Sequence, residues 1–93
     1  MDVMEKFLDT EVSYQEIYEE ILYFVNLFDI RCGELECNEY IIKKFDQNNF
    51  FIFREDVYPD GRKEIDNVIN ISKDLFIEKL QQYAQKIGLK IIY

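Results

Sequence analysis

Two strand-forming runs flank a turn signature between residues 50 and 72, and this stretch constrains the fold more than any other. The first run is Phe50-Phe51-Ile52-Phe53, and the second ends Asn67-Val68-Ile69-Asn70-Ile71-Ser72. Between them lies Tyr58-Pro59-Asp60-Gly61. Proline suits the second position of a type I turn, and glycine can adopt the positive φ that follows. Because aromatic and β-branched residues favour strands, the stretch predicts a β-hairpin around a Pro-Asp-Gly turn.

A second antiparallel pair is expected just upstream. Residues 39–45 form an apolar run too short for its periodicity to separate strand from helix. The polar residues 46–49 make a suitable connection into Phe50, which favours a strand at 39–45 paired with 50–56 over a helix at 39–45. Gly33 indicates a turn in the weakly patterned segment 30–38. The expected sheet therefore has two or three antiparallel strands.

The clearest helix signal covers residues 14–29. Ser13 and Glu16 match a capping box, and Val12 and Ile17 match a hydrophobic staple. A step of 100° per residue gathers eight apolar side chains on one arc, which we expect to be buried. They are Tyr14, Ile17, Tyr18, Ile21, Leu22, Phe24, Val25 and Phe28.

A second helix is predicted at residues 73–87. Ser72 is positioned to cap it, Ile71 and Phe76 can staple its start, and Gly88 ends it. Its expected buried arc consists of Phe76, Ile77, Leu80, Tyr83, Ala84 and Ile87.

Two shorter elements complete the expected chain. Residues 2–9 can form a short helix capped by Asp2, with an apolar edge made of Val3, Met4, Phe7 and Leu8. Residues 89–93 are an apolar tail that we expect to add a short terminal strand. Helices that flank an antiparallel sheet give the α+β class, and 93 residues suit one domain, residues 1–93.

The residue types present argue against an enzyme. The chain contains no histidine, which excludes Ser-His-Asp and Cys-His arrangements. Cys32 and Cys37 have four residues between them and no second cysteine pair, so a zinc site is not expected. We interpret them as small core or loop residues; a disulfide between them requires an oxidising setting. We therefore expect no catalytic residue, no cofactor and no metal.

Two further patterns limit where the chain acts and what it binds. Asp56, Asp60, Glu64 and Asp66 cluster near the turn and could hold Mg²⁺ or Ca²⁺, but they lack calcium-loop spacing, which favours a solvated strand end. The N-terminal residues show neither a basic nor an apolar signal region, and the longest apolar run is Ile21–Val25. We therefore expect a cytoplasmic protein that does not enter a membrane.

The negative charge is concentrated in one part of the chain. The formal net charge is −8. Residues 1–39 contain 11 acidic and 2 basic residues, or −9, whereas residues 40–93 contain 8 acidic and 9 basic residues, or +1. Such asymmetry is typical of a protein with a charged partner, and the acidic excess disfavours direct binding to nucleic acid.

The outer face of the helix at 14–29 is the candidate binding site. Its acidic residues are interrupted by two large apolar ones, and the set comprises Glu16, Glu19, Glu20, Tyr23 and Leu27. Protein interfaces often surround aromatic anchors with polar groups. Two alternatives are that segment 2–9 covers Tyr23 and Leu27, or that they are ordinary isolated exposed residues.

The combined features predict a small acidic protein-binding module. In size and charge the chain resembles the acidic inhibitors of phages and mobile elements, such as anti-CRISPR and anti-restriction proteins, and nuclease-toxin immunity proteins. That resemblance implies an inhibitor that binds the basic surface of a nucleic-acid-handling enzyme. The alternative is a homodimer or larger homo-oligomer with a structural or adaptor role, joined through the strand Phe50–Phe53 and the tail Ile91-Ile92-Tyr93.

Overall fold

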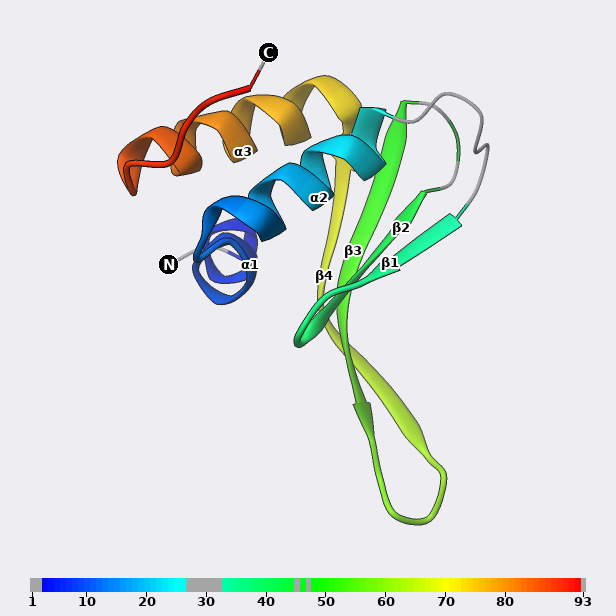
Figure 1. The fold of residues 1–93 in the computed structure, drawn as a ribbon. Coiled ribbons are helices and arrows are strands. Elements are labelled where there is room, and N and C mark those ends of the chain that lie inside the picture. Colours follow the sequence, from blue (N-terminus) through cyan, green and yellow to red (C-terminus); the bar gives the residue numbers. More distant parts are fainter. Residues whose placement is uncertain (1–2, 27–32, 45, 47, 93) are drawn as a thin grey trace.

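The described residues of the chain form three helices and a four-stranded antiparallel sheet, arranged as in Figure 1. The computed structural model describes residues 3–26, 33–44, 46 and 48–92. In chain order the elements are α1 (Val3–Glu11), α2 (Gln15–Asn26), β1 (Gly33–Glu36), β2 (Tyr40–Lys44), β3 (Asn49–Val57), β4 (Lys63–Ser72) and α3 (Lys73–Lys86). The predicted α+β class, with helices at both ends of the chain, is confirmed.

The strands follow one another through the sheet in the order β1-β2-β3-β4. β2 pairs with β3 from Tyr40 opposite Arg54 to Lys44 opposite Phe50, so the predicted strand in the 39–45 segment is confirmed. The predicted number of strands was too small. Gly33 does not form a turn but begins β1, which pairs with the end of β2 at Lys44.

β3 and β4 are the longest strands, and their far ends form an arm that projects from the body (Figure 1). We call residues 54–66 the arm. At its tip Tyr58 N–H donates to Arg62 O at 2.8 Å, and Gly61 N–H donates to Tyr58 O at 2.9 Å. Gly61 has φ +88°, the positive value expected at this glycine. The register shifts between Ile52 and Arg54, where Asn67 has φ +53°, because asparagine tolerates the left-handed region that a bulge requires.

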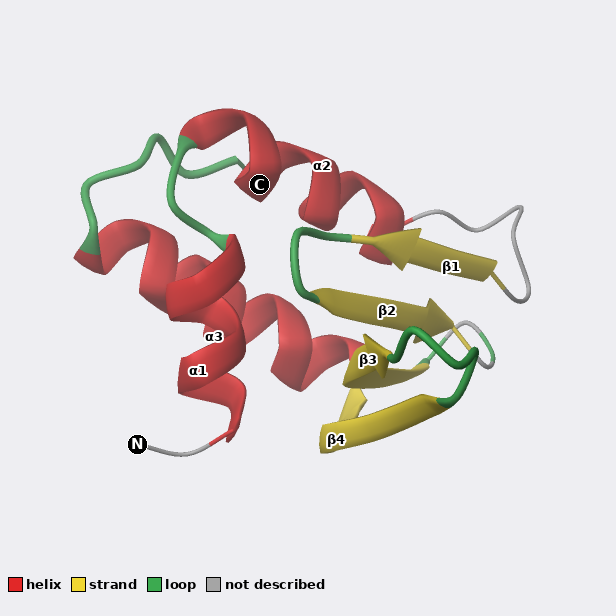
Figure 2. Ribbon diagram, turned by 90° about the horizontal axis from the view of Figure 1, so that it is seen from below, coloured by secondary structure: helices red, strands yellow, loops and turns green. Residues whose placement is uncertain are grey.

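The helices gather on one side of the sheet, and the core lies between the two layers (Figures 1 and 2). Phe7 of α1 packs edge-to-face on Tyr40 and Phe76, and Phe76 also packs on Phe50, with ring centroids 5.4 to 6.1 Å apart. Edge-to-face aromatic pairs stabilise a core beyond their buried area. These contacts anchor α1 on β2 and α3, and they anchor α3 on β3.

α1 and α2 differ from the prediction at their ends. α1 runs two residues further than the predicted 2–9 and finishes at Glu11, whose side chain is buried. α2 begins at Gln15, one residue late, and its described part ends at Asn26; the rest of the predicted 14–29 helix, with Phe28, lies outside the described residues. Tyr14 was predicted to be buried but is 51% exposed, because it precedes the helix instead of lying on its inner face.

α3 confirms the predicted helix and its cap. Ser72 is extended, and its hydroxyl accepts the N–H of Leu75 at 3.3 Å. Phe76, Leu80 and Ala84 are buried, while Ile87 at the end of the arc is 39% exposed. None of the helices in the described part of the chain combines the length and apolar character that crossing a membrane requires.

The tail after Gly88 does not form the predicted terminal strand over residues 89–92, the part of 89–93 that is described. It is held by side chains instead. The Gln15 amide donates to Lys90 O and accepts the Lys90 N–H, both at 2.9 Å. Gln81 Nε2 donates to Ile92 O at 2.6 Å, and Ile92 N–H donates to the Tyr18 hydroxyl at 3.0 Å. These partners on α2 and α3 satisfy the tail backbone, so it needs no neighbouring strand.

Candidate functional site: the acidic face of α2

α2 separates an apolar inner face from an acidic outer face. Its inner side buries Tyr18, Ile21, Leu22, Phe24 and Val25. Tyr18 is also fixed by its hydroxyl, which donates to Gln81 Oε1 on α3. This anchoring sets the rotation of the helix, so the residues on the opposite side point into solvent. Glu16, Glu19 and Glu20 are all exposed.

Tyr23 lies on the same outward side and is 69% exposed. Because Tyr23 is exposed, the alternative that segment 2–9 covers this residue is excluded. Glu19 and Glu20 lie four and three residues before Tyr23, at the spacing that places side chains next to each other on a helix. An exposed aromatic ring beside carboxylates is therefore what the structure presents here. Leu27, the fifth predicted site residue, lies outside the described residues.

The carboxylates of this face lack partners of opposite charge among the described ion pairs. The four pairs found there involve Lys43, Arg54, Arg62 and Lys63, all on the sheet or the arm tip. Glu16 and Glu20 are four residues apart, and Glu16 and Glu19 three apart, so like charges adjoin. Each such pair costs an isolated helix about 0.2–0.5 kcal/mol. The positive charges of a basic partner would attract these carboxylates and offset the repulsion between them.

A buried carboxylate that the sequence pattern did not reveal lies behind this surface. Glu11 is fully buried, and its Oε2 accepts the backbone N–H groups of Glu39 and Tyr40, each at 3.2 Å. Its Oε1 has no hydrogen-bond partner among the described residues. The Cys37 thiol is free, and burial together with the Glu11 carboxylate raises its pKa to about 12. A thiol of this kind is a poor nucleophile at neutral pH; Cys32 lies outside the described residues.

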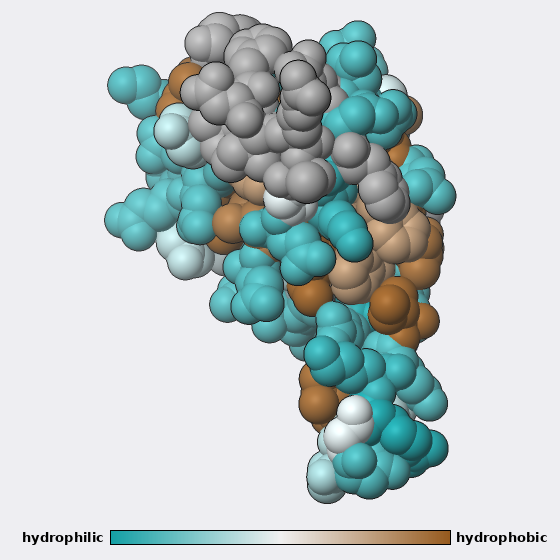
Figure 3. Space-filling model, turned by 90° about the vertical axis from the view of Figure 1, so that its right-hand side faces the viewer, coloured by the Kyte–Doolittle hydropathy of each residue, from teal (hydrophilic) through white to brown (hydrophobic). Residues whose placement is uncertain are grey.

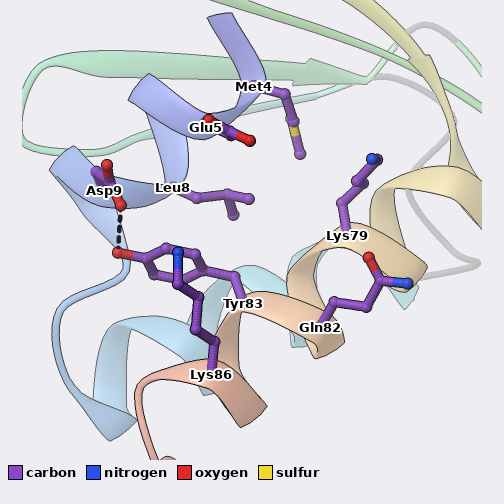
Figure 4. Close-up of a pocket in the computed structure, with 8 residues that line it drawn as sticks. All are labelled: Met4, Glu5, Leu8, Asp9, Lys79, Gln82, Tyr83 and Lys86. Atoms are coloured by element: carbon purple, nitrogen blue, oxygen red, sulfur yellow. Dashed lines mark hydrogen bonds between the residues drawn. The ribbon is translucent and has the colours of Figure 1, made fainter. Parts of the chain in front are cut away.

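A shallow cavity of about 210 Å³ lies between α1 and α3 (Figure 4). Its apolar floor is made by Met4 and Leu8, and lysines from α3 stand at its two ends. Tyr83 donates to Asp9 Oδ1 at 2.6 Å. That hydrogen bond and, to a smaller extent, burial raise the pKa of Tyr83 to about 12. The phenol therefore holds its proton at neutral pH and joins two helices instead of acting as a base.

Lys44 is a second charged residue that the sequence pattern did not place in the interior. It lies on the core side of β2, almost fully buried, with Nζ 5.8 Å from the centroid of the Phe50 ring. Burial lowers its pKa, and the nearby Lys73 lowers it further. Its position opposite Phe50 in the register explains the burial, because a strand of alternating faces turns every second residue inward.

The four acidic residues near the arm tip do not assemble into a metal site. Asp56 pairs with Arg54 at 3.8 Å, and Asp60 pairs with Arg62 at 2.7 Å. Glu64 instead accepts the Tyr58 hydroxyl at 3.0 Å. No group of three or more metal-binding side chains converges within the described part of the chain. Three of the four carboxylates, those of Asp56, Asp60 and Glu64, are thus engaged by neighbouring arginines and a phenol.

The elements suggested for edge-to-edge self-association already have hydrogen-bond partners within the chain. The strand Phe50–Phe53 lies in β3, which is hydrogen-bonded to β2 on one side and to β4 on the other. The tail residues Lys90 and Ile92 are bound by side chains of α2 and α3.

Comparisons with protein-family models, curated proteins and solved structures found no match to this chain.

Proposed function

We propose that this chain is a non-catalytic binding module whose α2 face docks on a basic protein surface. The observation that carries the proposal is the exposed Tyr23 ring on a helix face with three carboxylates and no basic residue. Tyrosine supplies a large contact area with few rotatable bonds, and rim carboxylates steer a basic partner into place.

The partner class that fits best is a nucleic-acid-handling enzyme, since such enzymes carry basic surfaces that bind phosphates. The module would occupy that surface and block the nucleic acid. This is the action of an anti-defence inhibitor, such as an anti-CRISPR or anti-restriction protein, or of an immunity protein for a nuclease toxin. The buried inner side of α2 supports this proposal, because it holds the helix rigidly and a rigid helix loses little entropy on docking.

The test compares two matched charge reversals. Glu16 and Glu20 occupy the second and sixth positions of α2, and Asp74 and Glu78 occupy the same positions of α3. All four are exposed. E16K/E20K and D74K/E78K therefore make the same change in net charge, at the same two helix positions and with the same spacing between the charges. Only E16K/E20K alters the proposed surface.

The wild type and both variants would be immobilised and exposed to lysate of the native host, and any retained enzyme assayed for inhibition. We expect the wild type and D74K/E78K to retain and inhibit the same enzyme. E16K/E20K should lose both activities, and Y23A should weaken binding by about 2 kcal/mol, as hot-spot aromatics do. Wild-type binding should fall steeply with added salt. Equal retention by E16K/E20K would refute the assignment of this surface.

A further inference from the structure

The side of the sheet turned away from the helices carries a second apolar surface. Tyr40, Ile42 and Lys44 of β2 are buried under the helices, so Ile41 and Lys43 point the other way. On β3, Phe50 and Ile52 face the core, and Phe51 and Phe53 lie on the outer face with ring centroids 5.3 Å apart. Phe53 is buried there, whereas Phe51 is half-buried. Figure 3 shows apolar side chains on this side of the molecule, extending down onto the arm.

The apolar surface continues along the arm. Glu55 and Val57 follow Phe53 at alternate positions, and they pair with Ile65 and Lys63. Val57 and Ile65 are 66% and 56% exposed. Two β-branched residues this exposed lie on a ribbon of only two strands, a structure that is marginally stable alone. The arm thus gains from a partner that covers this face.

A groove of about 340 Å³ opens where the arm meets the turn between β1 and β2. We call it the arm groove. Cys37 N–H donates to Tyr40 O at 2.8 Å and closes that turn, and the Glu11 carboxylate holds its backbone from behind. The lining of the arm groove includes the charged residues Glu36, Glu39, Glu55 and Lys63 and the apolar residues Ile41 and Val57.

The arm groove combines an apolar floor with an acidic rim. Lys63 is its single basic residue and pairs with Glu55 at 3.4 Å. Glu36 and Glu39 take part in none of the four ion pairs found among the described residues. The uncompensated charge of the groove is therefore negative. A second copy of this chain, itself with a net charge of −8, would be repelled, and a basic segment attracted.

We propose that the arm groove binds an extended basic segment of a partner protein. An apolar side chain of the segment contacts Ile41 and Val57, and a neighbouring Lys or Arg pairs with Glu36 or Glu39. This contact lies on the side of the sheet opposite α2 and forms a second interaction surface. The proposal for the arm groove can therefore be tested separately from the proposal for α2.

The test is an NMR titration of the full chain, labelled with ¹⁵N, using a capped peptide of alternating Lys and Val as probe. We expect saturable shifts centred on the amides of Glu39, Ile41 and Val57. The variant E36K/E39K should weaken binding about tenfold at low salt, as expected for the loss of two exposed ion pairs and new repulsion. V57S keeps every charge and should weaken binding about fivefold, through lost apolar contact.

D74K/E78K is the matched control, because it makes the same charge change on α3, outside both proposed surfaces, and should leave this affinity unchanged. A peptide of alternating Lys and Ser should bind about as weakly to the wild type as the Lys-Val peptide does to V57S. The proposal is overturned if shifts centre on α2, if both double variants weaken binding equally, or if no saturable binding occurs. It is also overturned if light scattering shows a dimer that V57S converts to a monomer.

Discussion

Glu11 provides the sharpest test of how this fold is held together. It is the last residue of α1, fully buried, and its Oε2 accepts two backbone N–H groups from the turn between β1 and β2. These contacts join segments 28 and 29 residues apart in the chain. Replacing Glu11 with alanine removes the acceptor and leaves a small void, because the side chain is fully buried.

The expected loss follows from the groups left behind. A buried N–H without an acceptor costs about 1–3 kcal/mol. The Tyr40 N–H is buried, while the Glu39 N–H is only partly buried and can be hydrated, so the two together should cost about 3 kcal/mol. Removing the carboxylate also removes its desolvation cost, which offsets the cavity term in part. E11A should thus lower the free energy of unfolding by about 3 kcal/mol, and E11Q, which retains an oxygen acceptor, by about 1 kcal/mol.

The measurement is urea unfolding followed by circular dichroism, with the slope against denaturant compared between proteins. Glu19→Ala is the control, since Glu19 is exposed and its removal should change stability by no more than about 0.5 kcal/mol. Hydrogen exchange at the Tyr40 amide should accelerate in E11A. If E11A is no less stable than E19A, the carboxylate does not support the turn. If E11Q loses as much as E11A, its charge and not its acceptor atoms matters.

Three further predictions concern single groups. In a C32S background, Cys37 should react with iodoacetamide at pH 8 at least about a hundredfold more slowly when folded than in denaturant, because its folded pKa is about 12 against an ordinary 9.0; equal rates would contradict this. The raised pKa of Tyr83 means that its contribution to stability is complete below pH 10 and is lost as pH rises towards 12, so stability of D9N should decline less over that window. Ser72→Ala should cost about 1 kcal/mol through loss of the α3 cap, and thermal unfolding that matches the wild type would refute the role of its hydroxyl.

The elements recovered from the sequence are those with long or redundant local signals. α2 and α3 have apolar arcs of several turns, and α3 also has the Ser72 cap. β3 and β4 are long enough for aromatic and β-branched residues to dominate. The outward position of Glu16, Glu19, Glu20 and Tyr23 follows from the same 100° step that placed the arc inward. Their role in binding stays a prediction.

What could not be predicted depends on partners distant in sequence. β1 is four residues long, and Leu35 is the one β1 residue whose side chain packs against the core. A single apolar residue is too little for a periodicity signal. Glu11 and Lys44 are buried charges, and a polar–apolar pattern assigns both to the surface. The apolar residues of the tail favour a strand, but Gln15 and Gln81 supply the hydrogen bonds that a neighbouring strand would give, so the predicted terminal strand is wrong for the described residues.

The side-chain contacts of the helical layer have a consequence for the order of folding. The sheet joins each strand to the next along the chain, so it can assemble by short-range closure while synthesis continues. By contrast, Tyr18 meets Gln81 and Ile92, and Asp9 meets Tyr83, across 63 to 74 residues. α1 and α2 are made first yet must wait for α3 and the tail before these contacts close. During that interval the parts of their apolar faces that α3 covers, such as the side of Phe7 that meets Phe76, are exposed, so a ribosome stalled before residue 80 should display an aggregation-prone intermediate.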